Sequence, residues 1–407
     1  MKCRHCENNL EHVFCDLQTC PTSNAMLSEE ELNHPETYYP LKVLVCDKCW
    51  LVQVDELEKA ENIFNNQYTY FSSFSTTWLQ HAKKYTDEME QRFLLNKNSL
   101  VIEIASNDGY LLQYFKEKDI PVLGIEPTAN TAEVAQSKGI ETIVDFFGSK
   151  LASQKLVGKA DLILGNNVLA HVPNINDFVQ GVKIALKQNG VVTFEFPHLC
   201  SLIEQNQFDT IYHEHFSYLS LTAVKSIFEK QGLHVFDVEK LSTHGGSLRV
   251  FAKHNNDNTK AISERVEQLL NEEKSLGVNS LFYYQGFQEK VEKIKYDFLR
   301  FLIEQKHANK KIAAYGAAAK GNTLLNYCGI KGNDLISFVV DASPHKQNKF
   351  LPGSRIPVLT EQKIKEWKPD YIIILPWNLK NEIEKQLSYI KEWGAQFVVA
   401  VPNLNIF

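Results

Sequence analysis

The stretch Val101-Ile102-Glu103-Ile104-Ala105-Ser106-Asn107-Asp108-Gly109 decides the fold expected for the middle of this chain. Apolar residues typical of a buried strand lead into a short polar loop, and residues 110–118 then have a helical pattern. Further strands are expected at residues 122–126, 162–166 and 191–196, again with helical stretches between them. Strands that alternate with helices indicate right-handed crossovers, so we expect an α/β fold with a doubly wound parallel sheet.

Two other regions flank this pattern. A strand is expected at residues 50–54, a polar and aromatic connector at 65–73, and a helix at 75–95. A polar boundary at residues 255–260 precedes two further regions with helical spacing, 261–276 and 281–305. The α/β pattern then restarts with a strand at 311–315, a turn at 316–321, a helix at 322–328, and strands at 337–341, 371–375 and 397–401. We therefore expect an N-terminal module at 1–70, a Rossmann-like core at 71–255, and a smaller Rossmann-like α/β domain at 256–407.

Cysteines are concentrated at the start of the chain, which holds six of the eight in its first 49 residues. Two C-x-x-C pairs, Cys3 with Cys6 and Cys46 with Cys49, can supply four thiolates to one tetrahedral Zn²⁺. Such a closed site has no open position for substrate, so its expected role is structural. Disulfides remain an alternative. The possible substitute ligands are His5, His12, Cys15 and Cys20.

Composition narrows the class of protein. The chain has 407 residues, a formal charge of −6, 44% hydrophobic residues and 23% charged residues, which is typical of a globular protein. No basic block points to nucleic acid. The N-terminus lacks the apolar run of a signal peptide, and the apolar runs are too short to cross a membrane. We expect a cytoplasmic protein.

The loop after the first core strand predicts a nucleotide site, because ligands collect at the carboxyl ends of parallel strands. Gly109 permits close approach of the backbone, and Asn107 and Asp108 can meet a charged amino acid moiety. Glu126 ends the next strand, where a carboxylate can accept both ribose hydroxyls. The loop lacks G-x-G-x-x-G, which favours S-adenosylmethionine over NAD. The alternative treats Glu103 and Glu126 as mere charges at strand ends.

Two further segments carry chemistry. Asn166 and Asn167 close a strand of the core and lead to His171; in methyltransferases this loop lines the reactive methyl group. Tyr212-His213-Glu214-His215-Phe216-Ser217-Tyr218 places a group that titrates near neutrality beside donors for a developing negative charge. His213 and His215 are alternatively metal ligands without an evident third partner. In an extended loop they would share one face, opposite Glu214.

Two glycine-containing segments are candidates for substrate binding. Residues 243–249, with His244, can wrap a phosphate or hydroxyl, or form a tight hairpin. In the last domain, Gly316 begins a strand-to-helix turn that carries Lys320 and Asn322, and backbone N–H groups at such a turn attract phosphate. Asp341, at the end of the following strand, can contact a ribose. Without further information the same turn can accept NAD.

Taken together, the paired C-x-x-C motifs, the 103–109 and 166–173 segments, the 212–218 segment and the 314–322 turn resemble one family. The chain is similar to S-adenosylmethionine-dependent C-methyltransferases that act on nucleotide-linked keto-deoxysugars. The resemblance covers almost the full length in the same order. It implies a nucleotide-diphosphate 4-keto-6-deoxysugar as substrate, methylated at carbon 3, with the nucleotide diphosphate held by the 316–322 turn.

The resemblance also implies roles for residues. Removing the proton next to a ketone gives an enolate, so the enzyme needs a base and a donor to the enolate oxygen. His215 is the candidate base, Tyr212 the donor, and Glu214 orients His215 or holds a sugar hydroxyl. Tyr70 or Tyr68 meets the substrate. We expect a monomer or homodimer; the alternatives are an NAD-dependent nucleotide-sugar oxidoreductase or epimerase, and a non-catalytic regulator that binds zinc and nucleotide.

Overall fold

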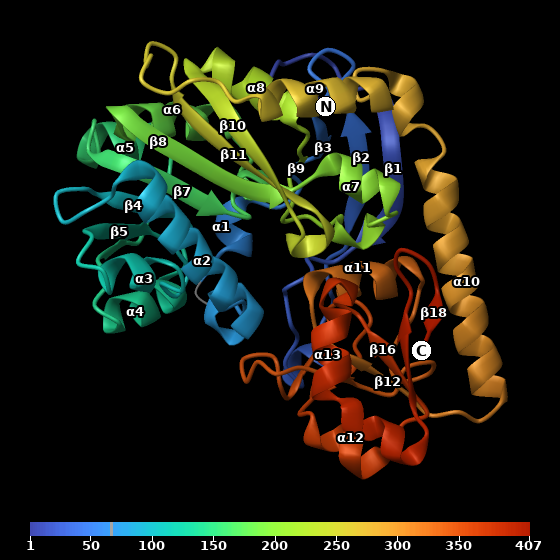
Figure 1. Cartoon of the computed structure of the whole chain (residues 1–407). Helices are drawn as coiled ribbons and strands as arrows, with labels where there is room; N and C mark the ends of the chain where they lie inside the picture. Colours follow the sequence, from blue (N-terminus) through green and yellow to red (C-terminus); the bar gives the residue numbers. More distant parts are fainter. Residues whose placement is uncertain (66–67) are drawn as a thin grey trace.

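A computed structural model describes residues 1–65 and 68–407 of the chain. Its strands form three sheets, one in the N-terminal module, one in the core and one in the C-terminal domain (Figure 1). The expected α/β class with a doubly wound core and a second Rossmann-like unit is confirmed. Asn66 and Gln67, which belong to the expected connector, lie outside the described residues.

The core sheet has seven strands in the order β10-β11-β8-β7-β4-β5-β6. The neighbouring strands β8, β7, β4, β5 and β6 are parallel to one another. The strand β11 lies between β8 and β10 and runs antiparallel to both. The strand bounds are β4 Val101–Ile104, β5 Val122–Ile125, β6 Thr142–Ile143, β7 Ala160–Asn166, β8 Leu186–Pro197, β10 Leu233–Leu241 and β11 Ser247–His254. The carboxyl ends of β4, β5 and β7 lie at one edge of the sheet, which is where parallel α/β sheets bind ligands.

Helices cover both faces of this sheet (Figure 1). Their bounds are α2 Thr76–Phe93, α3 Leu112–Lys116, α4 Ala129–Ser137, α5 Ser149–Lys155, α6 Ile175–Ala185, α8 Leu221–Lys230 and α9 Glu264–Leu276. The helix α7 Leu199–Glu204 packs instead in the hydrophobic cluster of the N-terminal module (Figure 1). Short 3-10 turns include η2 Ser72–Phe74, η3 Leu169–His171, η4 Phe208–Thr210 and η5 Thr243–Gly245. Although α9 lies beyond the expected boundary at 255, it packs against α8 and β10 of the core.

The N-terminal module is a four-stranded sheet, β1-β2-β3-β9. Three strands come from the start of the chain, β1 His12–Cys20, β2 Tyr39–Val45 and β3 Val52–Val54, followed by α1 Ala60–Ile63; η1 Glu30–Asn33 lies between β1 and β2. The fourth, β9 Ser217–Tyr218, comes from the histidine-rich segment and pairs antiparallel with β3. The module is therefore completed by residues about 165 positions later in the chain.

The C-terminal domain has a second seven-stranded sheet, β14-β15-β13-β12-β16-β17-β18. Its strands are β12 Ile312–Tyr315, β13 Val339–Val340, β14 Lys349–Phe350, β15 Pro357–Leu359, β16 Tyr371–Ile374, β17 Gln396–Val399 and β18 Asn405–Ile406. Its helices are α11 Ala319–Tyr327, α12 Gln362–Trp367 and α13 Lys380–Gln386, with η7 Trp377–Leu379 and η8 Ser388–Trp393. The long helix α10 Phe287–His307 connects it to the core (Figure 1).

Two expected helices begin elsewhere in the structure. The helix expected from residue 281 is divided into η6 Leu281–Tyr284 and α10, because Gly286 between them has a φ of 76°. The helix expected from residue 322 begins earlier, at Ala319, so Lys320 and Gly321 lie in the first turn of α11. A Cβ on Gly321 would lie 2.9 Å from Leu375, which shows how closely α11 packs on the sheet.

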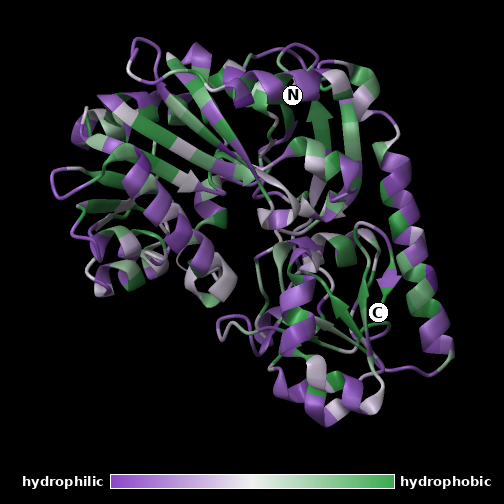
Figure 2. Cartoon of the chain, viewed as in Figure 1, coloured by the Kyte–Doolittle hydropathy of each residue, from purple (hydrophilic) through white to green (hydrophobic). Residues whose placement is uncertain are grey.

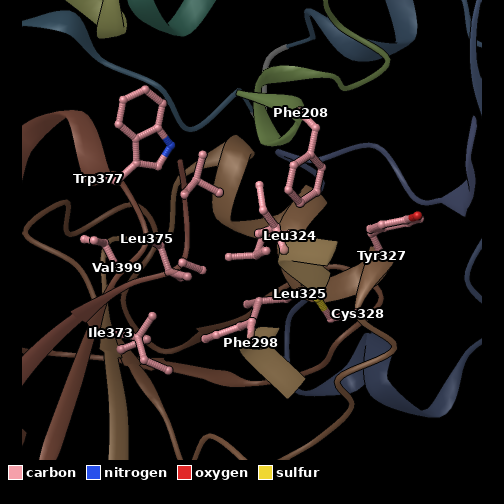
Figure 3. Packing of buried hydrophobic residues seen from close by; sticks show 14 of the residues in the cluster. Phe208, Phe298, Leu324, Leu325, Tyr327, Cys328, Ile373, Leu375, Trp377 and Val399 are labelled. Atoms are coloured by element: carbon pink, nitrogen blue, oxygen red, sulfur yellow. The ribbon is translucent and has the colours of Figure 1, made fainter. Parts of the chain in front are cut away.

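One hydrophobic core joins the N-terminal module, the segment from α7 to β9, and the C-terminal domain. Phe14 of β1 stacks on Phe287 of α10 at a ring distance of 4.6 Å. Phe208 points towards Leu324 of α11, and the strand residues Ile373 and Val399 lie on the other side of the same cluster (Figure 3). Figure 2 shows the strands of the core sheet mainly in the hydrophobic colour. The histidine-rich segment is therefore fixed by buried packing on both sides.

Candidate active site

Four cysteines form a closed cluster in the N-terminal module. The sulfur atoms of Cys3, Cys6, Cys46 and Cys49 all lie within 4.8 Å of one another, with 3.4 Å between Cys3 and Cys49. Each C-x-x-C pair turns in the same way: the residue after the second cysteine is left-handed, at Glu7 (φ 64°) and Trp50 (φ 61°). Four thiols converging on one point fit a tetrahedral zinc ion, and no position remains for substrate.

The alternative metal ligands and disulfides are not supported. Cys15 and Cys20 lie in β1 within the hydrophobic core, where burial raises the pKa of the Cys20 thiol to about 12. His5 donates or accepts at Asn176 and Ser226 through its two ring nitrogens and is not part of the cluster. All eight cysteines, each within the described ranges, are free.

The loop after β4 has the shape of a ligand-binding turn. Asn107 and Gly109 have left-handed φ angles of 50° and 74°, and a Cβ on Gly109 would lie 2.4 Å from Ile140. Glu126, after β5, accepts hydrogen bonds from the backbone N–H of Asn107 at 2.8 Å and of Thr128 at 2.9 Å. Burial raises the pKa of Glu126, and the hydrogen bonds from Thr128 oppose that shift. The carboxylate is thus fixed at the site where a ribose is expected.

The connector closes over this loop. Asn107 Oδ1 accepts from the backbone N–H of Ser72 at 2.9 Å, and its Nδ2 donates to the carbonyl of Tyr70 at 3.1 Å. Asp108 accepts from the backbone N–H of Ser73 at 3.3 Å. Both polar atoms of the Asn107 side chain and one carboxylate oxygen of Asp108 are therefore bonded to the connector, and Oδ1 of Asp108 has no partner among the described residues.

Several buried polar atoms around this loop have no partner among the described residues. They are Glu103 Oε2, Asp108 Oδ1, Asn166 Nδ2 and Asn167 Oδ1. Burial raises the pKa of Glu103 well above its usual range, and a hydrogen bond from Tyr110 opposes the shift. Buried polar atoms are normally paired, so a cluster of unpaired donors and acceptors indicates the place of a polar ligand. These atoms fit S-adenosylmethionine, with its amino acid and ribose groups.

His215 is held in one orientation by two hydrogen bonds. Its Nδ1 lies 2.9 Å from the carbonyl of Thr210, and its Nε2 lies 2.7 Å from the hydroxyl of Tyr212. A carbonyl only accepts, so Nδ1 carries the proton and Nε2 is the basic atom, which accepts from Tyr212. Burial, assisted by the nearby His171, lowers the pKa of His215 well below 6.5, so the ring is neutral near pH 7.

His171, in η3, faces His215. The two rings are 4.6 Å apart, centre to centre, with planes at 78°. Burial lowers the pKa of His171 to about 4. A chain of aromatic contacts continues to Phe64, 5.9 Å from His171, and from there to Tyr68 at 5.4 Å. Ring contacts thus connect η3, which follows β7, with the histidine-rich segment on one side and with the connector on the other.

Glu214 turns away from His215 towards the N-terminal module. Asn24 donates through Nδ2 to both carboxylate oxygens, at 2.7 and 2.8 Å. Burial raises the pKa of Glu214 to about 7, while Asn24 and the nearby Lys346 oppose the rise. The Glu214 charge in turn helps to raise the pKa of Tyr68, after the larger effect of burial. Tyr68 therefore lies beside this carboxylate, whereas Tyr70 is 43% exposed.

The segment 213–215 is not extended, so the shared face that an extended loop would give His213 and His215 does not form. The backbone N–H of His215 donates to the carbonyl of Tyr212 at 2.9 Å, which closes a turn. His213 consequently points to the other side, where its Nε2 lies 3.1 Å from the carbonyl of Pro40. His213 and His215 do not share a face, and the described residues place neither in a potential metal cluster. The metal-binding alternative for this segment is therefore not supported.

The 243–249 segment forms a hairpin between β10 and β11. His244 sits at its tip with a φ of 54°, 3.0 Å from Nδ2 of Asn167 and 5.1 Å from the ring of Trp78. Burial lowers the pKa of His244 to about 4, and the charge of Lys320 adds a smaller effect in the same direction. Arg249 does not face the site; it is buried in an ion pair with Glu195 at 3.0 Å. His244 therefore lies beside the loop that follows β7.

In the turn after β12, the backbone of Gly316 lies close to Pro376. Its φ is 91°, and a Cβ added to it would lie 2.5 Å from the Pro376 ring. Lys320 donates to Oδ1 of Asn378 at 2.7 Å, and burial lowers its pKa. Asp341 accepts from the backbone N–H groups of Ala317 at 2.7 Å and Ser343 at 2.8 Å. Asn322 is turned inward and donates to the carbonyl of Ser23 at 2.6 Å.

Three residues that support the site carried no signal in the sequence. Asn24 binds Glu214, as described above. Asp209, just before Thr210, accepts from the indole N–H of Trp377 at 2.7 Å. Thr323 of α11 donates to the carbonyl of Ile211 at 2.9 Å. These contacts join positions more than 100 residues apart, and a single sequence gives no indication of such pairs.

Comparisons with known proteins agree with this geometry. Three family models match, a zinc binding domain over residues 3–64, a methyltransferase domain over 78–238, and a C-methyltransferase C-terminal domain over 242–402. The C-methyltransferase NovU of Streptomyces niveus is 34% identical over 409 residues, covering 100% of this chain and 96% of NovU. The chain belongs to the S-adenosylmethionine-dependent C-methyltransferase family. The recognised family, the enzyme class, the S-adenosylmethionine cofactor and the zinc module are thereby confirmed.

Solved structures add little to this C-methyltransferase assignment. An S-adenosylmethionine-dependent methyltransferase from Archaeoglobus fulgidus is 14% identical and covers 42% of this chain and 94% of its own, with a TM-score of 0.34. The PH0226 protein of Pyrococcus horikoshii covers 46% of this chain and 95% of its own, with 15% identity and a TM-score of 0.38. These scores are low, so the assignment rests on the family models and the full-length relative.

In the described part of the chain no helix is long and apolar enough to span a membrane.

Proposed function

We propose that this C-methyltransferase moves the methyl group of S-adenosylmethionine to the carbon next to the ketone of a nucleotide-linked 4-keto-6-deoxysugar, at carbon 3. The observation that carries the proposal is the Thr210–His215–Tyr212 hydrogen-bond chain. It gives a neutral, buried imidazole with its basic nitrogen beside a phenol. A base and an oxyanion donor side by side suit proton abstraction next to a carbonyl.

The cofactor is expected beside the β4 loop, held by Glu126, Asp108 and the side chains of Asn166 and Asn167. When bound, it supplies an electrophilic methyl group. The connector is bonded to Asn107 and Asp108 of this loop, and His244 lies beside Asn167, so both can help to exclude water once the ligands are bound. A closed, dry site strengthens the interactions that stabilise charge during the reaction.

The reaction begins with a proton transfer to Nε2 of His215. The C–H bond next to the ketone breaks, its electron pair forms the enolate double bond, and the ketone oxygen becomes negative. Tyr212, which donates to Nε2 in the resting site, turns its hydroxyl to that oxygen. The proton on Nδ1 stays on that nitrogen and remains donated to the Thr210 carbonyl, so His215 becomes an imidazolium that the neighbouring His171 destabilises. The enolate carbon would then form its new bond to the methyl group that bound S-adenosylmethionine supplies, with the methyl–sulfur bond breaking and its electron pair staying on sulfur, and Nε2 of His215 would return its proton to water.

The nucleotide end of the substrate is assigned to the C-terminal domain. Gly316 and the start of α11 offer backbone N–H groups to phosphate, and α11 has nine residues. Lys320 adds a positive charge close enough to lower the pKa of both His215 and His244. The diphosphate is therefore expected between the domains, with the sugar pointing to His215.

Product analysis by mass spectrometry and NMR tests the proposal. The enzyme, S-adenosylmethionine and a nucleotide-linked 4-keto-6-deoxysugar should give a product with one added methyl on carbon 3. The matched 4-hydroxy sugar, which cannot enolise, should give none. Methylation of the 4-hydroxy sugar at a similar rate, or methylation on oxygen, would contradict the proposal.

A further inference from the structure

We propose that Arg4, which lies between the first two metal-binding cysteines, is a positioning residue that fixes the distance between the His171 and His215 loops. The inference rests on the proposed function, because it takes these two histidines to be at the reaction centre. It assigns the zinc site a role beyond stability: the ion holds the turn from which this arginine reaches the active site.

The guanidinium of Arg4 joins two backbone segments. Nη1 donates to the carbonyl of Pro173 at 2.9 Å, and Nη2 donates to the carbonyl of Val54. The same group lies over the ring of Phe216, 5.4 Å from its centre. Planar guanidinium groups suit such a fork, because their donors point in fixed directions.

Two of these three contacts lie close in sequence to the two histidines, and the third, Val54, is hydrogen-bonded to Phe216. Pro173 follows His171 by two residues, and Phe216 directly follows His215. Val54 donates through its backbone N–H to the carbonyl of Phe216 at 3.1 Å. Arg4 is therefore connected to the His171 loop directly and to the His215 loop through β3 and the Phe216 ring. A change at Arg4 should alter the 4.6 Å separation of the two imidazole rings.

Arg4 is itself held by the metal-binding turn. Its backbone N–H donates to Oε1 of Gln53 at 2.9 Å, and Nε2 of Gln53 lies 3.3 Å from Sγ of Cys3. Asn176 donates to the Arg4 carbonyl at 3.3 Å. The backbone of Gln53 pairs with Ser217 of β9. One glutamine thus contacts the metal cluster, Arg4 and the strand that continues the His215 loop.

The charge of Arg4 supports a positioning role over a simple stabilising one. No carboxylate among the described residues forms an ion pair with its guanidinium, and its Nε has no partner. A half-buried cation without a paired anion costs folding free energy. An apolar side chain would fill the same space, so the guanidinium is best explained by the two carbonyls that it joins.

The variants Arg4→Gln and Arg4→Lys test this role against Arg355→Gln. Arg355 is a matched control, because it also donates to two carbonyls, of Leu32 at 2.9 Å and His34 at 3.2 Å, but away from both histidines. Zinc content, S-adenosylmethionine affinity, kcat and KM are measured on the full chain. The ring C–H signals of His171 and His215 are followed by NMR, which requires no turnover.

Arg4→Gln should keep one zinc per chain and bind both ligands within about twofold, while kcat falls about 10²-fold, as expected for a misplacement near 1 Å. The NMR signals of both histidines should shift, and Arg4→Lys should recover part of kcat. Arg355→Gln should change neither kcat nor the NMR signals of the two histidines. An unchanged kcat and unchanged signals in zinc-loaded Arg4→Gln would overturn the inference, and so would equal changes in Arg355→Gln. Failure of the proposed function would show separately, as a wild-type enzyme without C-methylation.

Discussion

At the scale of single residues, the site depends on which nitrogen of His215 carries the proton. The Thr210 carbonyl at Nδ1 leaves the lone pair on Nε2, beside Tyr212. A depressed pKa keeps this nitrogen free of protons near pH 7. In the proposed mechanism this burial keeps His215 able to accept a proton, because a charged imidazole could not act as a base.

Asn24 and Glu214 give a pH-dependent prediction. Asn24 donates to both oxygens of Glu214, which favours the charged carboxylate and opposes the rise of its pKa to about 7. Asn24→Ala should raise that pKa further, so activity that needs the carboxylate should be lost at a higher pH as the solution is acidified. The measurement is the pH profile of kcat/KM. The fall of kcat/KM on the acid side of this profile is the part assigned to Glu214, so the control Glu214→Gln should remove it. An acid-side fall at the same pH in Asn24→Ala as in the wild type would contradict its assignment to Glu214.

At the scale of elements, β9 is the link between metal and chemistry. It pairs with β3, which follows directly on the second C-x-x-C turn, and it continues the turn that carries His215. The N-terminal module therefore supports the reaction centre as well as folding around its ion. Binding of zinc at such sites contributes about 10 kcal/mol or more of apparent folding free energy.

Cys46→Ser should lose the zinc and unfold the N-terminal module, because three thiols no longer complete a tetrahedral site. Metal analysis and thermal unfolding measure the two effects. Cys15→Ala is the matched control: it removes a buried thiol of β1 that lies outside the cluster, so it should lower stability modestly and keep one zinc. Full zinc content in soluble Cys46→Ser would show that a different set of ligands holds the ion.

Patterns local in sequence predicted much of this architecture. The strand-loop-helix unit that begins at Val101–Ile104 and the cluster of four cysteines follow from spacing, whereas the contact between the rings of His171 and His215 was not predicted. Long-range pairs were not predictable: the β9–β3 pairing and the Asn24–Glu214 bonds depend on three-dimensional packing. The shared face of His213 and His215 depended on an extended backbone, and the structure has a turn at Tyr212–His215 instead, which a single sequence does not specify.

At the scale of the whole molecule, one contact between the C-terminal domain and the segment that leads to His215 is the hydrogen bond from the indole N–H of Trp377 to Asp209. Burial raises the pKa of Asp209 to about 6, and Trp377 opposes this by stabilising the carboxylate. A pKa raised on folding favours the protonated form, so the contribution of this group to stability is present at low pH and lost as pH rises through about 6.

Trp377→Phe removes the indole donor and should raise that pKa further. The variant should be destabilised by about 1–3 kcal/mol above about pH 8 and by less below about pH 5. Urea unfolding at both pH values measures the difference. The control is Trp393→Phe, whose indole N–H donates to the carbonyl of Pro369 at 2.9 Å. The loss of unfolding free energy in Trp393→Phe should be independent of pH. A loss in Trp377→Phe that is also independent of pH would contradict the proposed link between the Trp377 bond and the titration of Asp209.

The most direct test of the central claim is exchange of the sugar's α proton in D₂O without S-adenosylmethionine. Enolisation needs only the base and the oxyanion donor, so the wild-type enzyme should exchange the proton at carbon 3, visible by NMR. His215→Asn should abolish both exchange and methylation while binding of both ligands stays near normal. Tyr212→Phe should slow both steps by a smaller factor, up to about 10³-fold. Exchange at the wild-type rate in His215→Asn would contradict the account, because the base would then be another residue.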